Sequence, residues 1–259
     1  MLLTANLRLE TNAATAAPCI LMVSPQGGDA QSILKNDLHT SLPCTLRQYA
    51  DNYGNTCLRT VIPAGPFRLD SHIVADCFDQ IDVHPTAPFV PLEDLPDYVV
   101  QYILPSRYCE ADLLGDKAAE IAGTAAPGYP KVEAIRQWIH DQFQYAYGTT
   151  NSSSSAKDVI ASGTGVCRDY AHAGIALCRS LDIPARMVVG YLYQLKPMDM
   201  HAWFEAFVGG RWYTFDATQH RPLGNRIVIA YGKDAADVAI ATYFTDIGLT
   251  RLEVSVQAG

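Results

Sequence analysis

The residues best suited to chemistry are a cysteine, a histidine and an aspartate in the second half of the chain: Cys167, His201 and Asp216. Cys167 follows Gly163 and Gly165, which let the backbone turn sharply into the helix predicted to begin there. The first N–H groups of a helix have no partner within it, and the helix dipole places partial positive charge there. A thiol at this end is stabilised as a thiolate, the form that attacks carbonyl carbon atoms.

The predicted helix carries small residues along one face, at positions i, i+4, i+7 and i+11. These residues are Cys167, Ala171, Gly174 and Cys178. Such a face lets a β-sheet approach closely, with the thiol directed toward the sheet. His172 lies about 140° around the helix from Cys167, so it is not placed to reach the sulfur. The base must therefore come from another element.

The base and its partner are predicted on a β-hairpin. Gly209-Gly210 separates two alternating segments and is typical of a two-residue hairpin turn. With these glycines as the turn, Asp216 pairs with Trp203 and lies diagonal to His201 on the same face of the sheet. Diagonal side chains with Cα atoms roughly 7–8 Å apart allow an imidazole and a carboxylate to meet. A turn that differs by one residue would move Asp216 to the opposite face.

The three residues supply a nucleophile, a base and a group that orients the base, in that chain order. Each also has a structural interpretation, since a cysteine is commonly a small buried residue and a strand histidine beside aromatic rings is commonly a hydrogen-bonded core residue. A zinc site is a further alternative. One cysteine, one histidine and one aspartate are a thin ligand set without a CxxC or HxxxH pattern. We therefore expect no metal and no other cofactor.

The elements that position these residues differ between the two halves of the chain. Residues 1–104 show short alternating segments and turn signals such as those at 51–55, which predict antiparallel strands. Residues 105–259 show helical periodicity first and alternating strands afterwards. We predict an α+β fold, with an N-terminal β-domain over residues 1–104 and the catalytic domain over residues 105–259. Predicted helices cover residues 111–122, 131–143, 156–161 and 167–182, and the later predicted strands cover residues 185–193, 201–208, 211–218, 226–231 and 250–257.

The composition is that of a folded protein, with 49% hydrophobic and 18% charged residues among 259. A net charge of −8 argues against a general role on nucleic acids or membrane surfaces. The first residues alternate like a strand and do not form a basic start with an apolar run, so we expect a cytoplasmic protein. Seven cysteines without a CxxC pattern predict no disulfide framework.

Three motifs resemble those of the transglutaminase-like superfamily. They are G-V-C-R-D-Y-A at residues 165–171, H-A-W-F-E at 201–205 and W-Y-T-F-D-A-T at 212–218. The resemblance implies a papain-like core, in which a helix bearing the cysteine packs on an antiparallel sheet bearing the histidine and the aspartate. It implies that Cys167 is the nucleophile, His201 the base and Asp216 the residue that orients the base.

The resemblance extends toward both ends of the chain. D-N-Y-G-N at 51–55 resembles the N-terminal domain of bacterial members, and I-A-Y-G-K-D-A-A-D-V-A at 229–239 resembles their C-terminal region. Lys233 stands where the superfamily more often has arginine. The resemblance therefore covers nearly the whole chain and is to bacterial proteins.

The reaction stays open at this point, because active members of the superfamily share a thioester acyl-enzyme and differ in what resolves it. Water gives hydrolysis of a peptide or isopeptide-type amide, which is our first hypothesis, and an amine gives the transamidation of a transglutaminase. A binding or scaffolding module without turnover is the third. We expect a peptide or protein amide as partner, no nucleic acid and no membrane, and we leave the oligomeric state open.

The oxyanion of such a reaction needs hydrogen-bond donors. The backbone N–H of Cys167 is one predicted donor, and the sequence assigns no second one. Trp138, Tyr145 and Tyr147 lie upstream and are interpreted as core aromatic residues.

Overall fold

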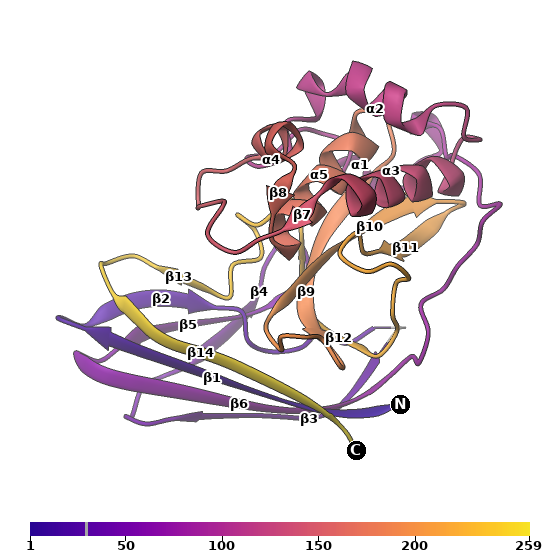
Figure 1. The fold of residues 1–259 in the computed structure, drawn as a ribbon. Helices are drawn as coiled ribbons and strands as arrows, with labels where there is room; N and C mark the ends of the chain where they lie inside the picture. Colours follow the sequence, from indigo (N-terminus) through magenta and orange to yellow (C-terminus); the bar gives the residue numbers. More distant parts are fainter. Residues whose placement is uncertain (29–30) are drawn as a thin grey trace.

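The computed structural model describes residues 1–28 and 31–259. Its N-terminal part is built from antiparallel strands in two four-stranded sheets, with orders β14-β1-β6-β3 and β13-β2-β5-β4 (Figure 1). Side chains of β1 alternate between buried and more exposed, as expected for a strand with one face on a core. The first six strands are β1 (Leu2–Ala13), β2 (Ala17–Leu21), β3 (Gln31–Thr40), β4 (Arg47–Ala50), β5 (Thr56–Ile62) and β6 (Gly65–Cys77).

The last two strands of the chain return to these N-terminal sheets. β13 (Ala241–Tyr243) pairs antiparallel with β2, and β14 (Gly248–Ala258) pairs antiparallel with β1 along nearly its whole length. Figure 1 shows β14 beside β1, with the two chain ends close together. The division at residues 104 and 105 remains a prediction, but the sheets of the N-terminal part contain strands from both ends of the chain.

A third four-stranded sheet, with order β11-β10-β9-β12, forms the centre of the remaining part. Its strands are β9 (Ala185–Leu192), β10 (His201–Val208), β11 (Arg211–Phe215) and β12 (Arg226–Gly232). The turn between β10 and β11 is Gly209-Gly210, and both glycines have positive φ angles of 58° and 85°. The predicted two-residue turn is confirmed.

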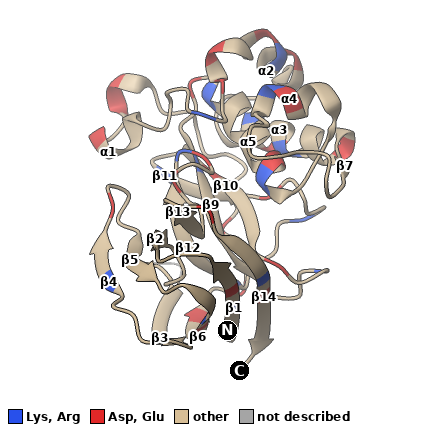
Figure 2. Ribbon diagram, turned by 90° about the vertical axis from the view of Figure 1, so that its left-hand side faces the viewer, with Lys and Arg blue, Asp and Glu red and all other residues tan. Residues whose placement is uncertain are grey.

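The helices lie mainly on one face of this central sheet (Figures 1 and 2). They are α2 (Gly115–Ala122), α3 (Tyr129–Gln142), α4 (Ala156–Ser162) and α5 (Cys167–Arg179), preceded by a 3₁₀ turn, η2 (Ala111–Leu113). Gly174 of α5 faces Phe204 of β10 so closely that a Cβ atom would lie 2.4 Å from the ring. The predicted face of small residues therefore does bring the cysteine helix close to the sheet.

The opposite face of the sheet is covered by the segment that leaves the N-terminal part. This segment contains η1 (Leu92–Asp94) and α1 (Asp97–Val100), and Leu95 and Val99 pack on Phe207 of β10. In Figure 2 the central strands lie between α1 on one side and the other helices on the other side. The α+β fold with a cysteine-bearing helix on an antiparallel sheet is thus confirmed.

Three details of the predicted elements are wrong. The strand predicted over 211–218 ends at Phe215, before Asp216. The helix predicted over 111–122 is interrupted at Leu114, so that η2 and α2 are separate. The helix predicted to reach residue 182 ends at Arg179. Asp182 has a positive φ of 57°, which is incompatible with a right-handed helix. Within residues 1–28 and 31–259, no helix combines the length and the apolar character needed to cross a membrane.

Candidate active site

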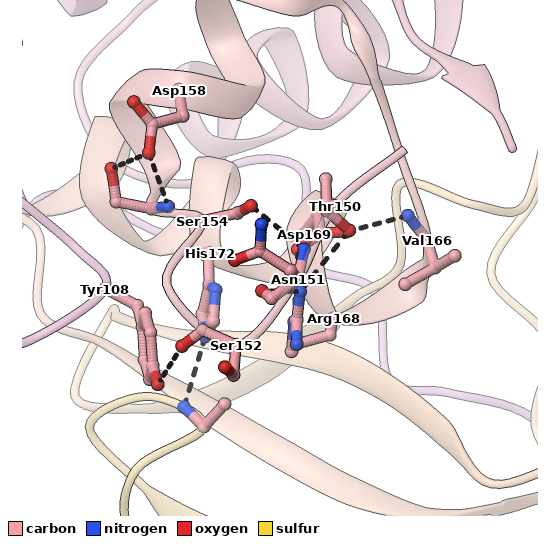
Figure 3. A network of polar contacts seen from close by, with 12 residues as sticks. Tyr108, Thr150, Asn151, Ser152, Ser154, Asp158, Val166, Arg168, Asp169 and His172 are labelled. Atoms are coloured by element: carbon pink, nitrogen blue, oxygen red, sulfur yellow. Dashed lines mark hydrogen bonds and ion pairs between the residues drawn. The ribbon is translucent and has the colours of Figure 1, made fainter. Parts of the chain in front are cut away.

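Cys167 is the first residue of α5, and the start of this helix is fixed by a buried carboxylate. Asp169 Oδ2 accepts hydrogen bonds from the Val166 backbone N–H at 2.9 Å and from Thr150 Oγ1 at 2.6 Å (Figure 3). The neighbouring Arg168 forms an ion pair with Asp169 at 2.9 Å. A negatively charged cap at the third helical residue satisfies an otherwise free N–H group. It therefore holds the turn that presents Cys167.

The serine-rich loop before α4 is tied to the same helix start. Arg168 donates a hydrogen bond to the Asn151 carbonyl oxygen at 3.0 Å, and Tyr108 donates one to the Ser152 carbonyl oxygen at 2.7 Å. Figure 3 shows these contacts on one side of α5. The backbone of this loop is therefore anchored beside the cysteine helix.

His201 and Asp216 meet through a buried hydrogen bond of 2.8 Å between His201 Nε2 and Asp216 Oδ2. Their exposed fractions are only 3% and 1%. The observed register pairs Phe204 with Phe215, which continues to the predicted alignment of Trp203 with Asp216. The diagonal geometry predicted from the glycine turn is therefore confirmed.

The electrostatics of this pair favour an ion pair. Burial raises the pKa of Asp216, but the charges of His201 and Arg226 and the hydrogen bonds it accepts outweigh burial and hold its pKa below the usual range. Burial lowers the pKa of His201, but Asp216 and then the nearby Cys167 side chain raise it to about 9. The ionised carboxylate accepts a hydrogen bond from the Nε2–H group, so Nδ1 is the nitrogen left for Cys167.

Two further residues hold the carboxylate, and neither was predicted from the sequence. Arg226 Nη2 donates to Asp216 Oδ2 at 2.9 Å, and the Arg226 guanidinium lies 4.7 Å from the centre of the Trp203 ring. The Thr218 backbone N–H and hydroxyl donate to Asp216 Oδ1 at 3.1 and 2.7 Å. These donors fix the orientation of the carboxylate toward His201.

His172 lies on α5 but takes no part in this arrangement, as predicted from its position around the helix. It is fully buried, stacks on Tyr108 with ring centres 5.1 Å apart, and accepts a hydrogen bond from the Ala235 N–H at 3.1 Å. Burial lowers the pKa of His172 to about 4. It is a neutral histidine of the core.

The interpretation of the upstream tyrosines as core aromatic residues is wrong. Tyr145 and Tyr147 are 44% and 61% exposed. Tyr145 lies on β7 (Gln144–Tyr145), which pairs in parallel with β8 (Thr164–Gly165) just before Cys167. Burial and then the Cys167 side chain raise the pKa of the Tyr145 hydroxyl above its ordinary value. A two-residue strand is too short for periodicity to reveal, so the sequence could not place Tyr145 beside the cysteine.

The seven cysteines of the chain form no disulfide bond. All seven are free thiols, and Cys19, Cys57, Cys77, Cys109 and Cys178 are buried as predicted for small apolar residues. In the described part of the chain, no three His, Cys, Asp or Glu side chains are arranged to hold a metal ion.

Comparisons with known proteins agree with this architecture. A family model described as the transglutaminase-like superfamily matches residues 115–217, which include all three candidate residues. The crystal structure of a Cytophaga hutchinsonii protein, described as a "putative cysteine protease", is 36% identical, with a TM-score of 0.93, and the match covers 99% of this chain and 90% of that chain. An uncharacterized protein of Mycobacterium leprae is 25% identical over 94% of this chain and 92% of its own length. The periplasmic domain of TgpA from Pseudomonas aeruginosa is more distant, with 17% identity, a TM-score of 0.43 and coverage of 83% of this chain and 87% of that chain.

The fold and the site define a class of proteins in which a cysteine begins a helix and faces a histidine–aspartate pair on an antiparallel sheet. The family match spans the cysteine helix and the hairpin, and the relative at 36% identity covers almost the entire chain. The chain belongs to the transglutaminase-like superfamily.

Proposed function

We propose that this protein is a cysteine hydrolase that cleaves a peptide or isopeptide-type amide, with Cys167 as nucleophile, His201 as base and Asp216 as the residue that orients it. The observation that carries the proposal is the buried hydrogen bond between His201 and Asp216, with Cys167 near enough to raise the pKa of the imidazole. A base oriented by an ionised carboxylate beside a helix-borne thiol is the arrangement that nucleophilic catalysis requires.

In the first half of the reaction, the Cys167 thiolate attacks the amide carbonyl carbon, and the carbonyl π electrons move to oxygen. The backbone N–H at the start of α5 stabilises this oxyanion. The intermediate collapses to a thioester as the C–N bond breaks, and His201 gives its Nδ1 proton to the leaving amine. In the second half, His201 removes a proton from water, and the water oxygen attacks the thioester carbonyl carbon. The C–S bond then breaks, which releases a carboxylic acid and the free thiolate.

We propose hydrolysis and not transamidation because hydrolysis needs no binding site for an amine as second substrate. The relative from Cytophaga hutchinsonii carries a protease description, and it matches this chain over nearly its full length. Similarity of this extent supports the same type of chemistry but leaves the substrate to experiment.

A first test needs no substrate. Wild-type protein is treated with limiting iodoacetamide at pH 7, and the labelled cysteines are identified by mass spectrometry. Cys167 is expected to react at least about tenfold faster than Cys44, which is also partly exposed. His201→Ala should remove this advantage, because the imidazolium that pairs with the thiolate is gone. Equal rates at the two cysteines in the wild type would contradict the proposal.

A second test identifies the acceptor. Peptide and protein libraries are incubated in ¹⁸O-labelled water together with a tagged primary amine, and products are read by mass spectrometry. Hydrolysis places one ¹⁸O atom in the new carboxylate, whereas transamidation places the tag on glutamine. Both signals should vanish in Cys167→Ala and persist in Cys44→Ala. Tag incorporation without ¹⁸O would replace hydrolysis by transamidation, and turnover that survives in Cys167→Ala would reject the mechanism.

A further inference from the structure

A tyrosine outside the proposed triad, Tyr145, lies beside the start of the cysteine helix. It belongs to β7, which pairs in parallel with β8, and Figure 1 shows this pair next to α5. Tyr145 is paired with Gly165, two residues before Cys167, and the next residue, Ala146, donates its backbone N–H to the Gly165 carbonyl oxygen at 3.0 Å. The backbone of Tyr145 is therefore fixed against the turn that presents the thiol.

Aromatic packing directs the Tyr145 side chain along the first turn of α5. Its ring centre lies 5.8 Å from that of Tyr170 and 5.6 Å from that of Tyr147. Tyr170 is buried and stands three residues after Cys167, so these two residues share one side of the helix. The Tyr145 ring is thus held on the side of α5 that carries the thiol, while 44% of the residue stays exposed to an approaching substrate.

The Tyr145 hydroxyl lies near both the side chain and the backbone N–H of Cys167. Burial, and then the charge of the Cys167 side chain, raise the pKa of this hydroxyl, whereas the Cys167 backbone N–H lowers it in part. Because the pKa is raised on balance, the hydroxyl keeps its proton while the thiol is ionised and remains a hydrogen-bond donor. A neutral donor therefore stands beside the N–H group that the proposed mechanism assigns to the oxyanion.

We propose that Tyr145 is a further catalytic residue, whose hydroxyl donates a hydrogen bond to the oxyanion formed when Cys167 attacks the amide carbonyl. This role rests on the proposed function. As the sulfur bonds to the carbonyl carbon, the π electrons move to the oxygen, which accepts hydrogen bonds from the Tyr145 hydroxyl and the Cys167 backbone N–H. The proton stays on Tyr145, and the C=O double bond forms again when the amine leaves. A donor that acts on charge developing in the transition state raises the rate more than it strengthens substrate binding.

The test compares two reactions of the Cys167 thiolate in Tyr145→Phe, which lacks only the hydroxyl. 4-Nitrophenyl acetate acetylates the thiolate through an oxyanion, and the release of 4-nitrophenolate gives the rate. Iodoacetamide alkylates the thiolate at a CH₂ carbon atom and forms no oxyanion, and mass spectrometry gives its rate at Cys167. Acetylation should slow at least about tenfold, while alkylation should change by less than about twofold. The ester concentration that gives half the maximal rate should stay unchanged, because the lost hydrogen bond belongs to the transition state.

Two further variants complete the experiment. Tyr98→Phe, at an exposed tyrosine of α1, is the matched control and should be acetylated at the wild-type rate. Cys167→Ala gives the background from the other thiols, and circular dichroism verifies that every variant is folded. Equal slowing of acetylation and alkylation in Tyr145→Phe would place the effect on the thiolate and overturn the proposal.

The remaining outcomes separate the role of Tyr145 from the proposed function. Acetylation of Tyr145→Phe at the wild-type rate, with none above background in Cys167→Ala, would reject Tyr145 as an oxyanion donor and leave Cys167 as the nucleophile. Acetylation that survives undiminished in Cys167→Ala would reject the nucleophile and the role of Tyr145 together.

Discussion

At the scale of single residues, the site is governed by one buried carboxylate. Asp216 accepts hydrogen bonds from His201, Arg226 and Thr218 while it is almost fully buried. Such a group is stable only when its charge is balanced and its lone pairs are used. The neighbouring imidazole provides part of that balance and is held in its charged form in return.

We expect His201 to titrate near pH 9, well above the ordinary value of 6.5, because Asp216 and Cys167 together outweigh the burial of the ring. NMR of ¹⁵N-labelled histidine, with His201→Gln for assignment, measures this directly. Asp216→Asn should move the transition to lower pH, whereas Asp70→Asn, in a partly exposed ion pair with Arg8, should leave it in place. Since the folded pKa is raised, the associated stability is present below pH 6.5 and is lost as pH rises toward 9. A transition at the ordinary value in the wild type would contradict the ion pair.

The pKa of a second buried histidine, His172, is shifted in the opposite direction. Burial lowers the pKa of His172 to about 4, so between pH 6.5 and 4 the unfolded chain binds a proton that the native protein does not. Stability should therefore fall in this window, by roughly 2 kcal/mol at pH 5 relative to pH 7. Urea unfolding at the two pH values tests this. His172→Gln should lose this part of the acid sensitivity, and His72→Gln, at a partly exposed histidine of β6, should retain it. Equal sensitivity in both variants would be inconsistent with the assignment.

At the scale of elements, the position of His201 depends on close packing within the sheet. Gly190 on the central strand β9 lies between His201 of β10 and Val228 of β12. A Cβ atom at Gly190 would lie 2.0 Å from the Ile227 carbonyl oxygen and 3.1 Å from the Trp203 ring. The strand that carries His201 and the strand that carries Arg226 are therefore held in register around a residue that must remain glycine.

Gly190→Ala should destabilise the protein by more than about 2 kcal/mol, because backbone and not only a flexible side chain occupies the space. Gly115→Ala is the matched control: nothing lies within 4 Å of its Cβ position at the start of α2, so its effect should be neutral or slightly stabilising. Thermal and urea unfolding compare the two variants. A mild effect at Gly190 would mean that β12 shifts easily, contrary to the packing described.

The hairpin was predictable from sequence because two adjacent glycines fix both the turn and the register, and the register fixes where Asp216 lies relative to His201. The helix start was predictable because glycines precede Cys167. The role of Arg226 could not be predicted, because its contact with Asp216 depends on how β12 aligns beside β9. No local sequence pattern encodes that alignment. Tyr145 was missed for the same reason, through the short parallel pair that brings it next to Gly165.

At the scale of the whole molecule, the final strand is part of the first sheet. β14 pairs with β1 from Leu3 to Asn12, and Val256 is buried opposite Ala5. The segment 250–257 could be predicted as a strand from its alternation, but its partner could not, because pairing across the length of the chain leaves no local trace.

Val256→Asp should therefore lower the free energy of unfolding by about 2–3 kcal/mol, because it places a charge in the core of the N-terminal sheets. Gln257→Asp, the exposed neighbour on the same strand, should change it by less than about 0.5 kcal/mol. Denaturant unfolding of both variants gives the comparison. Equal small effects would show that β14 contributes little to the stability of the N-terminal sheets.

The pairing of β1 with β14 also sets the order in which the protein can be completed during its synthesis. Residues 2–13 are made early, yet one edge of their sheet stays open until residue 258 has left the ribosome. Joining strands so distant along the chain carries a large loop-closure entropy and favours slow folding. The N-terminal sheet therefore keeps an unpaired strand edge until β14 is available, and an unpaired edge favours association with other chains during that interval.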